Sequence, residues 1–222
     1  MARLARVVIP DIPHHVTQRG NGRARVFFSD DDYALYLKLL KAACAAAKVR
    51  CLAYALMPNH VHLVLVPANA EGLSKAMASV HRAYAGTINA RRKKSGHFWQ
   101  GRFGCVGLDG EHTLAALRYV LLNPVRARLC AKPDGWRWSS AGAYLRNRPD
   151  GLTETGDLRA LCPNIKSLLA PSPEQEMAEM LLRRAETIGR PLGSAAFLEK
   201  LERKLDRPLK LAKRGPKPRA AK

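Results

Sequence analysis

The chain has 222 residues and an apolar share of 47%, enough for one domain of ordinary size with an appendage. Its 38 Lys and Arg outnumber 18 Asp and Glu, which gives a net charge of +20 and favours a nucleic acid over a membrane surface as partner. Five cysteines without C-x-x-C spacing argue against a disulfide framework and a cysteine zinc site, and no apolar run approaches the roughly 18 residues of a membrane span.

The first half of the chain predicts a mixed sheet and helix domain. Ser29 and Asp32 form a capping-box pattern that begins a helix. In chain order the predicted elements are a strand at 14–20, a helix at 29–48, strands at 50–57 and 60–67, a helix at 73–94 and a strand at 97–108. This β-α-β-β-α-β order is that of a ferredoxin-like fold.

The second half predicts helices and a basic end. A third helix at 110–123 is closed by Pro124, since proline interrupts a helix. Two further helices are expected at 173–189 and 194–205, followed by a tail rich in Lys and Arg. We therefore divide the chain into a main domain at 1–147, a linker at 148–172, a helical region at 173–206 and a disordered basic tail at 207–222.

The strand "HVHLVLVP" carries two histidines within an apolar run. Because strand side chains alternate, His60 and His62 lie on the same face. An H-x-H pair offers two imidazoles to a divalent metal, whereas the equally weighted alternative is two histidines of a packed core. A metal site also needs a third ligand from elsewhere in the fold.

The third helix, "EHTLAALRYVLLNPVRARL", presents Tyr119 and Asn123 away from its apolar stripe. They are four residues apart and so are neighbours on one helical face. A tyrosine hydroxyl next to an amide oxygen is unusual for core packing. By itself, however, this pattern is equally well explained by an ordinary amphipathic helix that carries a tyrosine on its surface.

At the level of combined motifs, the sequence resembles the REP-associated tyrosine transposases, a branch of the HUH superfamily of single-stranded DNA nucleases within the IS200-like transposases. The resemblance runs through five motifs over residues 1 to about 147, and the stretch "GRPLGSAAFLEKLE" resembles their C-terminal region. The motifs are "HHVTQRGNGRARVFF", "YALMPNHVHLVLVP", "FWQGRF", "LRYVLLNPVRA" and "WRWSSAGAYL".

The resemblance implies an α+β fold: a ferredoxin-like βαββαβ catalytic domain with an added catalytic helix and a helical, basic C-terminal extension. It implies that His60 and His62 ligate Mg²⁺ or Mn²⁺, that Asn123 is the third ligand, where many relatives have Gln, and that Tyr119 is the nucleophile. Imidazoles and an amide leave open positions for phosphate oxygens and water.

The implied activity is metal-dependent cleavage and rejoining of single-stranded DNA through a 5′-phosphotyrosine. The implied substrates are hairpins of short palindromic repeats. We expect a cytoplasmic, nucleoid-associated protein without membrane contact that acts as a monomer or a homodimer.

DNA-binding residues are expected among cations and aromatic rings near the motifs. Trp99 and Phe103 could stack on unpaired bases, with the packing of Trp99 in the core as the alternative. The tail would add salt-sensitive affinity. The remaining candidates are Arg19, Asn21, Arg23, Arg25, Arg102, Arg126 and Arg128, and in the tail Lys213, Arg214, Lys217 and Arg219.

Two alternatives remain for the function. A non-catalytic nucleic-acid-binding regulator would keep the fold without the reaction. A metallophosphodiesterase would use the H-x-H pair with an activated water, and it would tolerate Tyr119→Phe.

Overall fold

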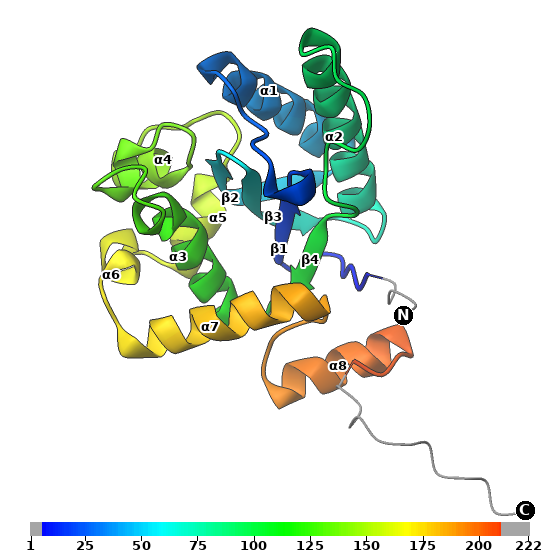
Figure 1. Ribbon diagram of the computed structural model, residues 1–222. Coiled ribbons are helices and arrows are strands. Elements are labelled where there is room, and N and C mark those ends of the chain that lie inside the picture. Colours follow the sequence, from blue (N-terminus) through cyan, green and yellow to red (C-terminus); the bar gives the residue numbers. More distant parts are fainter. Residues whose placement is uncertain (1–5, 210–222) are drawn as a thin grey trace, which may run out of the picture.

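The computed structural model describes residues 6–209, and Figure 1 shows its elements around one sheet. Four strands, β1 (His14–Arg19), β2 (Val49–Met57), β3 (His60–Pro67) and β4 (Gly104–Gly107), pair antiparallel in the order β2-β3-β1-β4. The helices between them are α1 (Asp30–Ala46) and α2 (Gly72–Arg91). This βαββαβ arrangement confirms the predicted α+β, ferredoxin-like fold.

The sheet separates two apolar layers. On one face Val16 and Leu63 pack with Tyr36 of α1 and Met77 of α2. The opposite face carries Val64 and Val106 and packs against α3 (Gly110–Arg126). Alternation along the strands assigns the two faces, so the even-numbered residues of β3 face α3.

The capping box predicted at the start of α1 is present. The Ser29 hydroxyl accepts a hydrogen bond from the Asp32 N–H. The Asp32 carboxylate in turn accepts from the Ser29 N–H. Asp32 also accepts from the Phe28 N–H and from the guanidinium of Arg91. One carboxylate therefore fixes the beginning of α1 and joins it to the end of α2.

Three predicted boundaries are wrong, and the first is the end of the second helix, expected at residue 94 and found at Arg91. The strand expected at 97–108 is reduced to Gly104–Gly107, because the preceding residues bend and meet the end of β1 through an isolated Gly20–Trp99 bridge and its flanking backbone hydrogen bonds. The third helix continues past Pro124 to Arg126. Proline's φ suits a helix, so the chain stays helical through Pro124 to Arg126, and the missing N–H removes only one hydrogen bond.

The second half of the chain adds five helices among the described residues. They are α4 (Ala141–Leu145), α5 (Thr155–Leu161), α6 (Ile165–Leu169), α7 (Pro173–Ile188) and α8 (Ala195–Leu205). The segment expected as a linker thus contains α5 and α6, and α6 contacts α3. The division into domain, linker and helical region stays a prediction.

Helix α7 lies across α3 and next to β4, as the orange and yellow ribbon in Figure 1 shows. Its Leu182 is fully buried in the layer shared with α3. Gly189, at a φ of 69°, ends the helix in the left-handed conformation that glycine adopts without strain. Within residues 6–209 no helix is long and apolar enough to cross a membrane.

The candidate tail residues Lys213, Arg214, Lys217 and Arg219 lie outside the described residues.

Candidate active site

Three histidines gather on the face of the sheet that α3 covers. In the ladder of β1 and β3, Arg19 pairs with His60 and Thr17 pairs with His62. Paired residues point to one side, and His15 is two residues from Thr17, so His15 shares this face. The ring centroids of His60 and His62 are 4.8 Å apart, and those of His15 and His62 are 5.2 Å apart.

Both H-x-H histidines use their Nδ1 atoms within the protein. His60 Nδ1 lies 2.6 Å from Asn59 Oδ1, and His62 Nδ1 lies 3.1 Å from His15 Nε2. The Nε2 atom of each ring is consequently free of these bonds. Engagement of one ring nitrogen by a protein partner is the usual arrangement around a histidine that ligates a metal through the other.

Burial keeps these rings neutral at physiological pH. It lowers the pKa of His60 to about 4, with help from the charge of Arg19, and the pKa of His15 to about 3. The pKa of His62 falls well below its usual value, by burial first and then through the neighbouring His15 and His60 and the charges of Arg19 and Arg183. Neutral imidazoles have a lone pair available for a metal.

Tyr119 projects from α3 onto the histidines. Its ring meets His62 edge to face, with centroids 5.2 Å apart and planes at 87°, and meets His15 at 5.8 Å. Only 8% of the residue is exposed. Burial and the charge of Glu186 raise the pKa of Tyr119, whereas Arg183 and a hydrogen bond with Asn123 oppose the rise.

Asn123 and Arg183 therefore lie close to the Tyr119 hydroxyl, Asn123 from one turn further along α3 and Arg183 from α7. The Arg183 guanidinium is 5.2 Å from the centre of the Tyr119 ring, and that of Arg126 is 5.8 Å away. The tyrosine thus has an amide and two cations around it, a setting that favours a bound phosphate.

Helix α7 is attached beside the tyrosine by a buried ion cluster. Glu179 accepts from Arg118, the residue before Tyr119, and lies 2.6 Å from Arg126, one turn beyond Asn123. Both Arg118 and Glu179 are only 3% exposed. Each buried charge here has an opposite partner, as burial of charge requires.

Seven residues further along α7, Glu186 reaches the histidines. Its Oε1 lies 3.3 Å from His15 Nδ1, and burial raises the pKa of its carboxyl to about 7 against the charges of Arg19 and Arg183. His15, His62 and Glu186 each offer a donor atom within 4.8 Å of the others. Two imidazoles and a carboxylate are donors that suit a divalent metal.

The structure thus brings His60, His62, Tyr119 and Asn123 together, as the sequence predicts. The roles of ligand and nucleophile stay predictions. The sequence reasoning missed His15, Arg183 and Glu186. A signal for His15 exists in the doublet His14–His15, because strand alternation turns one of the two toward His62.

Two of the predicted DNA-binding cations lie at this site: Arg19 pairs with His60 in the β1–β3 ladder, and the Arg126 guanidinium is 5.8 Å from the centre of the Tyr119 ring. Arg19, Asn21, Arg23 and Arg25 are exposed at the end of β1, and the adjacent segment that contains exposed Arg102 is joined to β1 by backbone hydrogen bonds from Asn21 and Gln100. Gly20 lets the chain turn back tightly after β1, since a Cβ there would lie 2.2 Å from the Ala24 carbonyl oxygen. Arg128 is exposed beyond α3.

The two aromatic candidates are engaged within the protein. The Trp99 indole N–H donates to the His81 carbonyl, and its ring packs on His81 and Phe98. Phe103 is 9% exposed, with the Arg6 guanidinium 3.7 Å above its ring. Base stacking by either ring stays a prediction.

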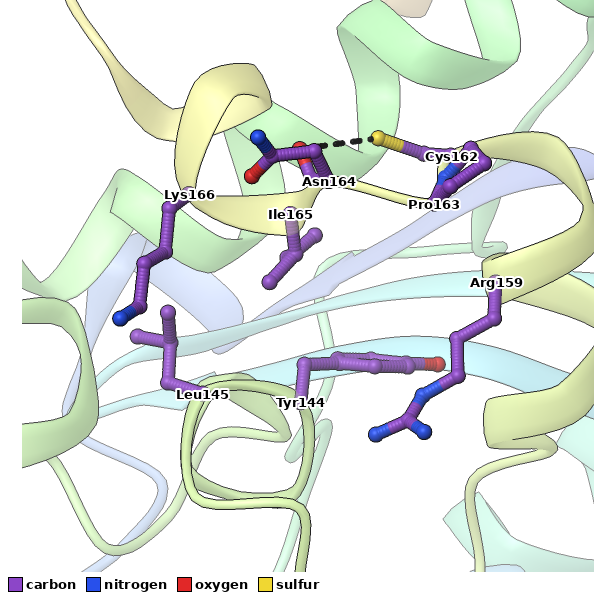
Figure 2. Close-up of a pocket in the computed structure, with 8 residues that line it drawn as sticks. All are labelled: Tyr144, Leu145, Arg159, Cys162, Pro163, Asn164, Ile165 and Lys166. Carbon is purple, nitrogen blue, oxygen red and sulfur yellow. Dashed lines mark hydrogen bonds between the residues drawn. The ribbon is translucent and has the colours of Figure 1, made fainter.

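A separate pocket lies away from the histidines, between α4 and the segment of α5 and α6 (Figure 2). Its volume is about 460 Å³. Figure 2 shows the Tyr144 ring at its floor, Arg159 and Lys166 on either side, and a Cys162 thiol that donates to the Asn164 carbonyl. None of its lining residues belongs to the tyrosine and histidine site.

Comparisons with known proteins agree with this architecture. The family model described as "Transposase IS200 like" matches residues 9–122. A solved REP-associated tyrosine transposase bound to a REP hairpin is similar at 15% identity and a TM-score of 0.57, over 70% of this chain and 90% of that one. A protein from Deinococcus radiodurans R1 described as a candidate transposase is 17% identical over 55% of this chain and 97% of that one, with a TM-score of 0.39. None of the curated proteins compared with the chain matches it.

The fold is therefore that of a ferredoxin-like domain in which a sheet-borne histidine pair faces a helical tyrosine. With the family model matching residues 9–122, the chain belongs to the IS200-like transposase family.

Proposed function

We propose that the chain is a metal-dependent single-stranded DNA transposase that cleaves and rejoins strands through a 5′-phosphotyrosine on Tyr119. The observation that carries the proposal is the edge-to-face contact of His62 with Tyr119, with Asn123 one helical turn beyond the tyrosine on α3. It unites a nucleophile and metal-binding groups in one place. Family membership supports the transposase class.

The residues present fit a divalent ion such as Mg²⁺ or Mn²⁺. His60 and His62 are neutral and their Nδ1 atoms have partners within the protein, so Nε2 is the ring atom that each would turn to a metal, and the Asn123 amide oxygen is a further hard donor. Such an ion would hold and polarise a scissile phosphate.

The covalent step belongs to Tyr119. Its oxygen attacks the phosphorus and the bond from phosphorus to the 3′ oxygen breaks, so the 5′ phosphate stays on the tyrosine and the leaving 3′ oxygen takes up a proton. A 3′-OH that attacks the phosphotyrosine reverses the step and joins strands. The bond energy is conserved in the intermediate, so joining needs no nucleotide cofactor.

The surroundings of Tyr119 prepare it for this role. Its raised pKa means that the hydroxyl is protonated at neutral pH and must lose its proton on attack. Arg183 and Asn123 favour the phenolate against the burial that opposes it. Arg183 and Arg126 would also meet the phosphate oxygens that flank the reacting group.

We propose a DNA hairpin from a palindromic repeat as the substrate. The similar solved transposase is bound to a REP hairpin. In this chain Arg19 pairs with His60 at the histidine face and would contact the phosphates of a single strand there. The exposed Arg23, Arg25 and Arg102 would bind further phosphates of that strand. A DNA substrate implies action at the nucleoid, and a chain that brings its own tyrosine to its own histidines can act as a monomer as well as in a homodimer.

The deciding experiment incubates the full chain with hairpin DNA labelled at either end and Mn²⁺, beside Tyr119→Phe. We expect a protein-linked fragment downstream of the break that is lost in the variant and with EDTA. Cleavage that survives Tyr119→Phe would assign the reaction to a metal-activated water. Tight binding without cleavage on any repeat would favour a regulatory DNA-binding protein on the same fold.

A further inference from the structure

A chain of three side chains, of which the two histidines are buried and Glu186 is partly exposed, connects α7 with the H-x-H strand. Glu186 Oε1 lies 3.3 Å from His15 Nδ1, and His15 Nε2 lies 3.1 Å from His62 Nδ1. His15 and His62 are 1% and 3% exposed. His15 Nδ1 and Glu186 Oε1 are both buried and have no hydrogen-bond partner among the described residues, so the 3.3 Å approach places two unpaired polar atoms side by side without the angle of a hydrogen bond.

The contact between the two histidines allows two proton arrangements. A neutral imidazole carries one N–H, so either His15 Nε2 or His62 Nδ1 is the donor. If His15 donates, the single proton of His62 is on Nε2 and no lone pair points toward a metal. If His62 donates, its Nε2 lone pair is free and the proton of His15 is on Nδ1, facing Glu186.

The carboxylate of Glu186 selects between these arrangements. It only accepts hydrogen bonds when ionised, so it stabilises a proton on His15 Nδ1. That leaves His15 Nε2 as the acceptor for the His62 N–H. A carboxylate or other acceptor behind a ligating imidazole fixes its tautomer and ring orientation in the same way at known metal sites.

We propose that Glu186 and His15 are positioning residues that hold His62 as the Nδ1–H tautomer, with Nε2 presented to the metal. This assignment rests on the proposed function and adds to it two residues that neither the H-x-H motif nor the tyrosine helix contains. Glu186 also lies beyond residues 9–122, the part that the family model matches. The helical C-terminal region thereby becomes part of the active site.

The docking of α7 supports this role. Glu179 and Glu186 are seven residues apart and share one helical face with Leu182, which is fully buried. The ion cluster of Glu179 with Arg118 and Arg126 fixes one end of that face on α3. Glu186 is therefore held at the histidines by packing and charge at several points.

The test reads the tautomer directly in metal-free protein. The full chain is labelled with ¹⁵N-histidine, treated with EDTA, and the imidazole nitrogens are observed by NMR at pH 7.5, with His62→Gln used to assign the signal of His62. We expect the Nδ1–H pattern for His62 in the natural sequence. The Nε2–H pattern would overturn the proposal.

Variants of Glu186 separate positioning from simple packing. In Glu186→Leu we expect His62 to lose the Nδ1–H tautomer and Mn²⁺ affinity, measured by calorimetry, to fall by about 10- to 100-fold. Glu186→Gln keeps an acceptor oxygen and should retain the tautomer and affinity within about threefold. The matched control is Glu176→Leu, on the exposed side of the same helix, which should change neither.

Two results would contradict the proposal. An unchanged tautomer in Glu186→Leu would exclude control of His62 by Glu186. Loss of Mn²⁺ binding in Glu186→Gln with the tautomer retained would instead make Glu186 a direct ligand together with His15 and His62. The tautomer is measured without DNA or metal, so an absence of cleavage does not change the result of this measurement. In the same way, finding the other tautomer would not change the result of the cleavage test.

Discussion

His62 presents its ring to Tyr119 edge to face, with centroids 5.2 Å apart and planes at 87°. One residue comes from the strand β3 and the other from α3, so packing of this helix on this sheet face creates the contact. The histidine is 3% exposed and the tyrosine 8%. A reaction here would occur in surroundings with little water, where charges on the phosphate interact strongly with nearby groups.

Replacement of His62 should abolish cleavage while the fold is kept. We expect His62→Gln to reduce metal-dependent cleavage of hairpin DNA by at least about 100-fold. Loss of a residue that only hydrogen-bonds to a metal ligand already lowers metal affinity or activity by about 10- to 100-fold, and His62 is proposed to be a ligand itself. The control is His81→Gln, another buried histidine, which bonds to the Tyr36 hydroxyl in the other layer. It should lower the melting temperature and leave cleavage within about threefold. Equal losses of activity in both variants would contradict a special role for His62.

The parts of this site that sequence predicts are those set by local periodicity. Alternation along β3 puts His60 and His62 on one face, and the helical repeat puts Tyr119 next to Asn123. Neither inference needs knowledge of the fold. The meeting of the two pairs does not follow from the βαββαβ order, because α3 comes after its last strand, and only the resemblance to the REP-associated transposases implied it.

The contribution of α7 could not be predicted from the sequence in this way. Glu186 looks like one of several acids on an amphipathic helix, and its position at His15 depends on how α7 docks on α3. That docking is fixed by the ion pairs of Glu179 with Arg118 and Arg126. From the sequence alone, these two arginines have the character of surface or DNA-binding cations. Long-range ion pairs leave no periodic signal.

Glu179→Ala should destabilise the protein strongly. Arg118 would be left buried without its partner, and removal of one member of a buried ion pair costs about 3–5 kcal/mol. Urea unfolding measures the change in the free energy of unfolding. Glu176→Ala, on the exposed face of α7, should change it by less than about 0.5 kcal/mol. The double variant Arg118→Leu/Glu179→Leu should be more stable than Glu179→Ala; a double variant that is less stable would contradict the assignment of the loss to an unpaired charge.

Asp32 should make stability depend on pH in the acid range. Burial alone would raise the pKa of its carboxyl, but hydrogen bonds and charge from Arg91 and the N–H groups of Phe28 and Ser29 lower it. The stabilisation is therefore complete above the unfolded pKa, about 3.9, and is lost as the pH falls through the folded value. Asp32→Ala should cost about 1–2 kcal/mol at pH 7, as loss of a helix cap does, and should cost less at pH 3. An equal cost at both pH values, measured by urea unfolding, would contradict this account.

Removal of residues 210–222 should weaken DNA binding in a salt-dependent way. This segment contains Lys213, Arg214, Lys217 and Arg219, whereas Leu209 is buried against the apolar cluster of α8 and is retained. The magnitude of the slope of log K against log salt should decrease by about 0.7 for each single-strand phosphate that the tail neutralises in the full chain. Fluorescence anisotropy with a labelled hairpin at several salt concentrations measures the slope, and the labelled-hairpin cleavage assay should still give product. A slope that does not change would mean that the tail binds no phosphates and that the cations beside the histidine face supply the electrostatic affinity.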